Sequence, residues 1–134
     1  MKIPKPKKTK TKPLKRLREK ADTLFSRACF KYWGNKCQCC GKEATATHHF
    51  MAKSISAFLR YNIQNGTPLC YHCHRTRFHD LADPRAIEAV IKNRGQAWYE
   101  ELKKLKVEGE TKGGFMGVGY YKDKINNFKV YLND

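Results

Sequence analysis

The chain has 134 residues and carries 28 Lys and Arg against 12 Asp and Glu, which gives a net charge of +16. This length predicts one domain plus tails, and the charge excludes an acidic or neutral protein and favours a polyanionic partner, nucleic acid before an anionic membrane. No run of about 18 apolar residues exists and no apolar segment follows the first lysines, so we expect neither a membrane span nor a signal peptide. We therefore expect an intracellular protein whose six cysteines bind metal rather than form disulfides.

The N-terminal segment is the most basic part of the chain. Residues 1–16 hold eight of the basic residues and no acid. Three prolines and no apolar periodicity over residues 1–13 predict a disordered arm. Such an arm would bind DNA phosphates through counterion release; the alternative is a tail that only improves solubility. The candidate DNA-binding lysines in it are Lys5, Lys7, Lys8, Lys10 and Lys12.

Three helices are predicted around a central segment of turns. Apolar residues recur at steps of three and four from Leu14 to Trp33, and Gly34-Asn35 ends that helix. Asp83-Pro84 is typical of a helix start, and the pattern predicts helices to about Arg94 and over 96–106. The five glycines of residues 109–119 predict a flexible linker, and residues 120–134 fit a last helix, with a strand as the alternative.

Two C-x-x-C pairs predict a structural zinc site. Cys37 and Cys40 form the first pair, Cys70 and Cys73 form the second, and 29 residues separate them. Each spacing lets a tight turn point both thiolates at one ion, which favours tetrahedral zinc with four sulfur ligands. Cys39 cannot easily join Cys40 on the same ion, so we leave it out.

Histidines surround the second half of this frame and need another role, because the zinc has four ligands already. His48 and His49 are adjacent, and an extended backbone would put their rings on opposite sides. One ring could then hold a metal while the other faces a water molecule. His74 follows Cys73 directly and can approach the same metal from the other side.

The order C-x-x-C, His-His, Asn, C-x-x-C-His resembles the HNH (ββα-metal) endonucleases. Asn65 lies 16 residues after His49 and nine before His74, in agreement with the spacing of that family. The string HHFMAKSISAFLRYNIQNGTPLCYHCH, together with REKADTLFSRACF before it, also resembles the phage NinG/Rap branch of recombination nucleases. The resemblance covers roughly residues 12–106.

This resemblance implies a role for each matching residue. His49 would be the general base for the attacking water, and His48 and His74 would ligate one divalent metal, Mg²⁺, Mn²⁺, Ni²⁺ or Zn²⁺. Asn65 would brace the loop that orients His49 through hydrogen bonds to the backbone. A neutral imidazole suits a base that acts near pH 7, and a metal would stabilise the charge that develops on the phosphorus centre.

The chain departs from the NinG-like pattern at two positions. NinG-like members usually have an acidic or small residue in place of His48 and Asn in place of His74, so the ion here could be softer than Mg²⁺. The histidine-rich branch also has a third histidine one helical turn after the His74 position, where this chain has Phe78. His79 comes five residues after His74, about 140° round an α-helix, and this spacing neither favours nor excludes it as a further ligand of the catalytic ion. Arg75 and Arg77 are candidate phosphate clamps, with solvated helix surface as the alternative.

The resemblance thus implies an α+β fold: a small ββα-metal core on a four-cysteine zinc frame, flanked by helices, with residues 14–108 as the nuclease domain. We expect a hairpin that carries His48 and His49, and a motif helix from about Cys73. The expected function is a metal-dependent DNA endonuclease in the cytoplasm of a bacterial or phage-infected cell, acting on branched recombination DNA.

Two alternatives stay open for the function: a nicking endonuclease without structure specificity, and a non-catalytic zinc module that binds DNA. Membrane binding is disfavoured because the arm has no apolar anchor. Resolution of DNA junctions would need a homodimer, for which the aromatic residues at the C-terminus are the candidate interface: Tyr120, Tyr121, Phe128 and Tyr131.

Overall fold

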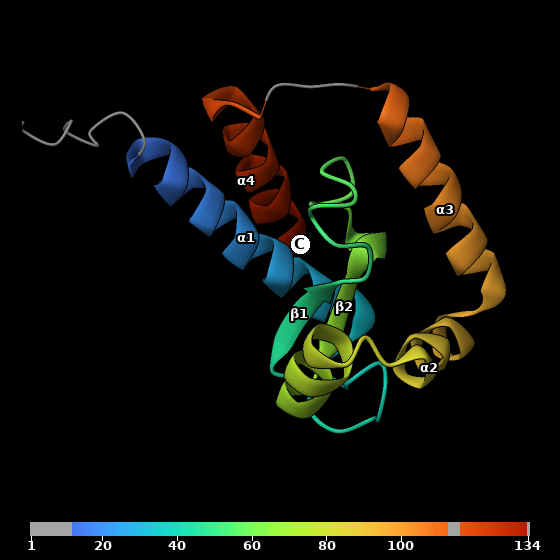
Figure 1. Ribbon diagram of the computed structural model, residues 1–134. Coiled ribbons are helices and arrows are strands. Elements are labelled where there is room, and N and C mark those ends of the chain that lie inside the picture. Colours follow the sequence, from blue (N-terminus) through green and yellow to red (C-terminus); the bar gives the residue numbers. More distant parts are fainter. Residues whose placement is uncertain (1–11, 113–115, 134) are drawn as a thin grey trace, which may run out of the picture.

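A computed structural model describes residues 12–112 and 116–133 of the chain (Figure 1). Within these residues, four α-helices surround a two-stranded antiparallel sheet and a short π-helix, so the α+β prediction is confirmed. In chain order the elements are α1 (Lys12–Trp33), β1 (Ala46–His49), η2 (Ile63–Asn65), β2 (Gly66–Leu69), η3 (Cys73–Asp80), α2 (Pro84–Arg94), α3 (Gln96–Thr111) and α4 (Val118–Asn133). Lys5, Lys7, Lys8, Lys10 and the rest of the predicted arm up to residue 11 lie outside the described residues.

Helices α1 and α4 form the larger core. They lie side by side and run in the same direction (Figure 1). Arg18 near the start of α1 donates a hydrogen bond to Tyr121 near the start of α4. Lys31 near the end of α1 donates one to the carbonyl oxygen of Tyr131 near the end of α4. Phe25 lies between them with Phe128, at a ring distance of 5.9 Å. The apolar stripe predicted for the first helix is therefore the face that α4 covers.

Two of the four C-terminal aromatic residues predicted to form an interface are buried inside the chain itself. Tyr121 is 2% exposed and Phe128 is 6% exposed, both in the core with α1. The prediction of an interface is wrong for these two residues, because the apolar face of α4 is already buried against α1 of the same chain.

The sheet is held on the end of α1. In the β1–β2 register, His48 pairs with Thr67 and His49 pairs with Gly66. The Ser26 and Thr47 hydroxyl groups are 2.9 Å apart and join α1 to β1. A Cβ at Gly66 would lie only 2.1 Å from the Cys29 sulfur, so glycine lets β2 approach the buried Cys29 closely.

Two helix boundaries differ from the sequence prediction. Helix α1 begins at Lys12, inside the predicted arm, since Pro13 is tolerated in a first helical turn. Helix α3 continues through Gly109 to Thr111, so the predicted 109–119 linker is shorter, and its residues 113–115 lie outside the described part.

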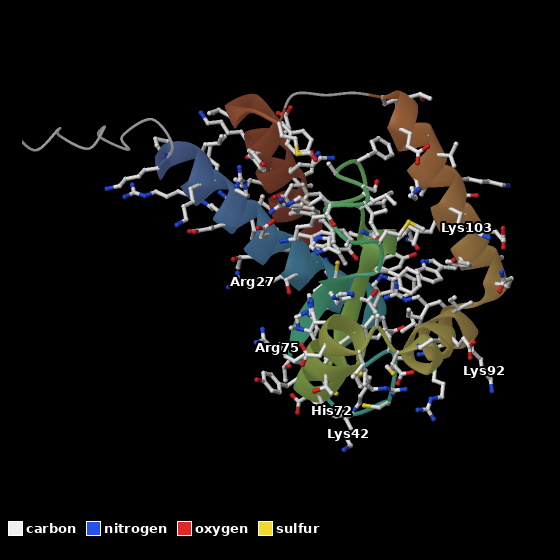
Figure 2. All side chains as sticks on the ribbon, viewed as in Figure 1. Arg27, Lys42, His72, Arg75, Lys92 and Lys103 are labelled. Carbon is white, nitrogen blue, oxygen red and sulfur yellow. The ribbon has the colours of Figure 1, made fainter. Side chains whose placement is uncertain are left out.

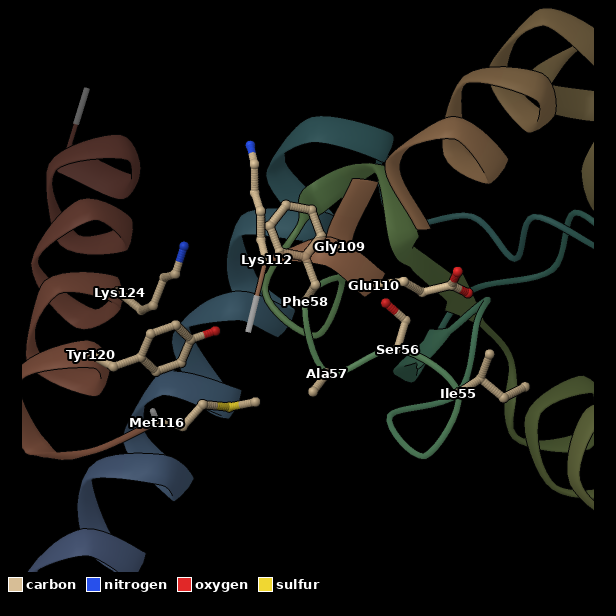
Figure 3. A pocket seen from close by; sticks show the side chains of 10 residues that line it. All are labelled: Ile55, Ser56, Ala57, Phe58, Gly109, Glu110, Lys112, Met116, Tyr120 and Lys124. Carbon is tan, nitrogen blue, oxygen red and sulfur yellow. The ribbon is translucent and has the colours of Figure 1, made fainter. Parts of the chain in front are cut away.

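Gly109 is required by packing: a Cβ there would meet the Phe58 ring at 2.5 Å, and Figure 3 shows the two residues. The last segment forms a helix, α4, and not the alternative strand.

A cavity of about 420 Å³ lies next to Phe58, between the 55–58 loop, the end of α3 and the start of α4; Figure 3 shows the side chains that line it. No helix within residues 12–112 and 116–133 is both long and apolar enough to cross a membrane.

Candidate active site

The four cysteines predicted as zinc ligands form one cluster. The sulfur atoms of Cys37, Cys40, Cys70 and Cys73 all lie within 4.8 Å of one another. The first pair sits on a tight turn that closes with a 2.9 Å hydrogen bond from the Gly41 N–H to the Cys37 carbonyl, and Gly41 has the positive φ of 81° that this turn requires. The second pair joins the end of β2 to the start of η3. Four soft sulfur ligands at this separation fit a tetrahedral metal such as Zn²⁺.

The protonation of these thiols also favours a cation. Burial opposes ionisation of Cys37, but hydrogen bonds from the backbone groups of Cys40 and Cys70 lower its pKa to about 7. Burial and the neighbouring Cys70 and Cys37 sulfurs raise the pKa of Cys73. Four thiolates this close would repel one another strongly, so a metal ion is what allows all four to ionise together.

A second cluster consists of three histidines. One ring nitrogen from each of His48, His74 and His79 lies within 4.8 Å of the others. The Nε2 atoms of His74 and His79 are 3.1 Å apart, and the His48 ring centre lies 5.3 Å from that of His74 and 5.1 Å from that of His79. His48 comes from β1, and the other two come from η3.

His79 joins this cluster because η3 is a π-helix. The 140° separation of His74 and His79 expected for an α-helix does not apply, since the i→i+5 hydrogen bonds of a π-helix bring residue i+5 back over residue i. One such bond, 3.0 Å long, joins the Leu81 N–H to the Thr76 carbonyl. Phe78, at the position of the expected third histidine, packs its ring against His48 at 5.0 Å instead.

His48 and His74 of this cluster have lowered pKa values and are therefore neutral at physiological pH. Burial, together with the charges of His74 and His79, lowers the pKa of His48 to about 3. Burial and the charge of His79 also lower the pKa of His74. Unprotonated imidazoles have the free lone pair that a metal ligand needs, so the cluster fits a divalent ion with three nitrogen ligands.

His49 points away from the cluster on the other side of β1, as the alternation of a strand requires. Its ring stacks on Phe25 at 5.2 Å, and its Nε2 lies 2.9 Å from the Arg60 carbonyl oxygen. Because a carbonyl only accepts, the Nε2 carries the proton and the Nδ1 has the free lone pair. Burial lowers the pKa of His49 to about 4, so the ring is neutral and able to accept a proton.

One cavity connects His49 with the histidine cluster. It has a volume of about 560 Å³, enough for a phosphodiester and a water molecule. Its lining residues are Asp22, Thr47, His48, His49, Ala52, Lys53, Ser54, His74 and His79. Of the predicted site residues, the structure therefore brings His48, His49, His74 and His79 to one opening.

Asn65 lies behind this cavity and is fully buried. Its side chain accepts a 2.7 Å hydrogen bond from the Met51 N–H and donates to the Met51 and Leu59 carbonyl groups at 3.0 and 3.3 Å. The Asn65 carbonyl oxygen accepts from the Phe50 N–H at 2.8 Å. Asn65 thus holds both ends of the loop that follows His49 and does not line the cavity.

Sequence reasoning missed a second set of residues behind His49. Asp22 of α1 accepts hydrogen bonds from the Arg60 guanidinium at 2.9 and 3.1 Å and from the Tyr61 hydroxyl at 2.8 Å. Arg60 supplies the carbonyl oxygen that accepts the hydrogen bond from the His49 Nε2–H. Arg60 and Tyr61 lie inside the long string that resembles the NinG/Rap branch, but no pattern in the sequence links them to an acid 38 residues before Arg60.

The basic residues predicted to contact phosphate differ in how far their side chains are free to reach DNA. Arg75 is exposed on η3 (Figure 2), and Lys12 is exposed at the start of α1. Arg77 instead donates to the Asp83 carboxylate at 3.3 Å and to the Cys39 sulfur at 2.9 Å. Arg77 is thus engaged within the fold, where it ties η3 to the first cysteine turn, and its phosphate contact stays a prediction.

Comparison with known proteins reaches the same segment. No curated protein and no solved structure matches this chain. The NinG/Rap part of the resemblance therefore stays a prediction. Residues 37–79, which hold the cysteine cluster and the histidine cluster together with His49 and Asn65, match the family model of the HNH endonucleases.

Proposed function

We propose that the protein is a metal-dependent DNA endonuclease. The observation that carries this proposal is that one cavity presents a neutral histidine base, His49, opposite three converging imidazoles, within a segment that matches the HNH endonuclease family. The net charge of +16 agrees with a nucleic-acid substrate. The cysteine cluster would bind a structural Zn²⁺ and hold β2 and η3 in place.

The residues of the cavity suggest the course of the reaction. The Nδ1 of His49 takes a proton from a water molecule, whose oxygen forms the new bond to phosphorus while the bond to the 3′ oxygen breaks. The Arg60 carbonyl keeps the base in the tautomer that this step requires. A divalent ion held by His48, His74 and His79 would stabilise the charge on the phosphorus centre and on the departing oxygen. Three imidazole ligands favour Zn²⁺, Ni²⁺ or Mn²⁺ over Mg²⁺.

The test is cleavage of supercoiled plasmid by the purified protein with each of these ions. His49→Ala is expected to lower the cleavage rate by about 10²–10⁴-fold, the range for loss of a general base, with zinc content and DNA affinity unchanged. The matched control is His72→Ala, since His72 is exposed, is not among the residues that line the histidine cavity, and lies near Lys42 in Figure 2. A His49→Ala variant that cleaves as fast as the parent would show that the base is another group.

The alternative function is a zinc-stabilised module that only binds DNA. It requires no second metal and no base. Metal analysis separates the two: the nuclease should take up a second divalent ion that His48→Ala removes, whereas the module should hold zinc alone. A parent protein that binds DNA but cuts none with any ion would establish the module.

The resemblance to the NinG/Rap branch favours branched recombination DNA as the substrate, and junction resolution would use two protomers. One preparation should be compared on four-way junction, nicked, single-stranded and linear duplex DNA. Faster cleavage of the junction, by a species that sediments as a dimer, supports a resolvase. Equal rates on all four substrates contradict this specificity and favour a general nicking enzyme.

A further inference from the structure

The outward face of α1 carries a row of basic side chains that the candidate active site does not use. Arg16, Lys20 and Arg27 line a shallow groove together with Thr23. The steps of four, three and four residues place these side chains on one face of the helix. The groove also contains Glu19 and the buried Leu24.

These three cations have no ion-pair partner within residues 12–112 and 116–133. The two acids of α1 are already paired with other residues: Glu19 with Lys15 at 4.0 Å, and Asp22 with Arg60 at 2.9 Å. With three cations and one acid, Glu19, among its described lining residues, the groove therefore keeps a net positive charge.

A fourth cation extends the row from the neighbouring helix. Lys129 of α4 is in contact with Lys20, and this contact lowers the pKa of Lys129. Two ammonium groups side by side repel each other, so the free protein keeps an unfavourable pair here. An anion bound between them would remove that cost.

The row begins beside the candidate active site. Arg27 directly follows Ser26, whose hydroxyl bonds to Thr47, and Thr47 lines the histidine cavity. Figure 2 shows Arg27 of α1 and Arg75 of η3 projecting to the same side of the molecule, on either side of β1. From Arg27 to Arg16 the row recedes from the cavity by about 16 Å, at about 1.5 Å per residue.

We propose that Arg16, Lys20, Arg27 and Lys129 form a phosphate track that binds the sugar–phosphate backbone of the DNA flank leading away from the cleaved bond. The proposal rests on the proposed function for its orientation, with the scissile phosphate in the histidine cavity. A length of about 16 Å corresponds to roughly five nucleotides of one strand, at about 3.4 Å per nucleotide. A membrane surface fits less well, because Leu24 is buried and no apolar side chain of the groove is available to enter lipid.

The first experiment measures DNA binding as a function of salt, in the full-length, zinc-loaded His49→Ala protein so that the DNA stays intact. In this background the track variant is Arg16→Gln/Lys20→Gln/Arg27→Gln. The control variant is Lys42→Gln/Lys92→Gln/Lys104→Gln, which removes the same charge from exposed residues elsewhere on the surface; Lys42 and Lys92 are labelled in Figure 2.

Each lost phosphate contact should reduce the slope of log K against log salt by about 0.9. For the track variant, which lacks three contacts, we expect the magnitude of the slope to fall by about 2.7 and the DNA affinity at 0.1 M salt to fall at least tenfold. The control variant should change little in both quantities. Equal losses in both variants would show a non-specific charge effect and overturn the proposal. The proposal would also be overturned if the track variant kept its DNA affinity and instead lost binding to an acidic peptide.

The second experiment shortens the DNA. Removing the flank beyond about three nucleotides from the cut, on the side that α1 would follow, should weaken binding of the parent but not of the track variant. Equal weakening of both overturns the track. This readout needs binding only, so a parent that binds but does not cleave would refute the nuclease and leave the track supported.

Discussion

The two side-chain clusters of residues 37–79 are built from neighbouring elements and differ in how many metal ligands they offer. The cysteine cluster has four ligands, and two of them, Cys37 and Cys73, are nearly inaccessible to solvent. The histidine cluster has three ligands and opens on a cavity of about 560 Å³. A closed set of four is typical of structural zinc, and three ligands with an open position are typical of catalytic metals. The same short segment thus combines a set of four thiols that fits a structural metal with an open set of three imidazoles that fits a catalytic one.

The two clusters are also coupled. Cys73 begins η3 and is followed immediately by His74, so a metal bound by the thiols would also fix the position of the two histidines of η3. Loss of the cysteine site should therefore disturb both clusters, whereas loss of the histidine site should leave the fold intact. Four variants test this asymmetry.

Cys73→Ser should have the largest effect. Apparent binding free energies of about 10–16 kcal/mol are typical for structural zinc and are coupled to folding, so we expect zinc loss and a molecule in which β2 and η3 no longer fold cooperatively. Amide exchange and zinc content measure this, and a strong chelator should do the same to the parent. Retention of one zinc and of the parent Tm would show that Cys73 is not a ligand.

His79→Ala should leave the fold intact and weaken divalent-ion binding at the histidine cluster by at least tenfold, since removing even a residue that only supports a metal ligand typically lowers metal affinity by that much. Calorimetric titration with Mn²⁺ or Ni²⁺ measures the affinity, and His72→Ala is the matched control. If both variants bind the ion equally well, His79 does not serve as a third ligand, and only His48 and His74 remain.

Asp22→Asn should slow cleavage by shifting the position of His49. The substitution weakens the hold on Arg60, whose carbonyl orients the base, and a displacement of about 1 Å can cost up to 10²-fold in rate. We expect single-turnover cleavage to slow by about tenfold to a hundredfold while metal affinity stays constant. The control is Glu19→Gln, an exposed acid one turn earlier on α1. An equal effect of both variants would rule out a specific role for Asp22.

Cys39→Ser should have the smallest effect. Cys39 lies beside the cluster but outside the set of four sulfurs, and its sulfur accepts a hydrogen bond from Arg77 that a serine oxygen can also accept. We expect one bound zinc, as in the parent, and a change of less than about 1 kcal/mol in the free energy of unfolding. Loss of zinc would place Cys39 among the ligands.

Local patterns were sufficient to predict much of this protein. The C-x-x-C spacing predicted the cysteine cluster, since two thiols two residues apart on one turn necessarily face the same point. The adjacency of His48 and His49 predicted rings on opposite sides of a strand, because side chains alternate there. These results depend on backbone geometry over a few residues, and the sequence contains it directly.

Other features were decided only by the packed structure. His79 reaches the cluster because η3 is a π-helix, and Asp22 meets Arg60 because α1 packs along the sheet. The Tyr121 and Phe128 rings are buried because α4 returns to lie along α1. Each depends on contacts between segments far apart in the chain or on a helix type that periodicity cannot distinguish, and the free energy that selects them comes from tertiary packing rather than from local preference.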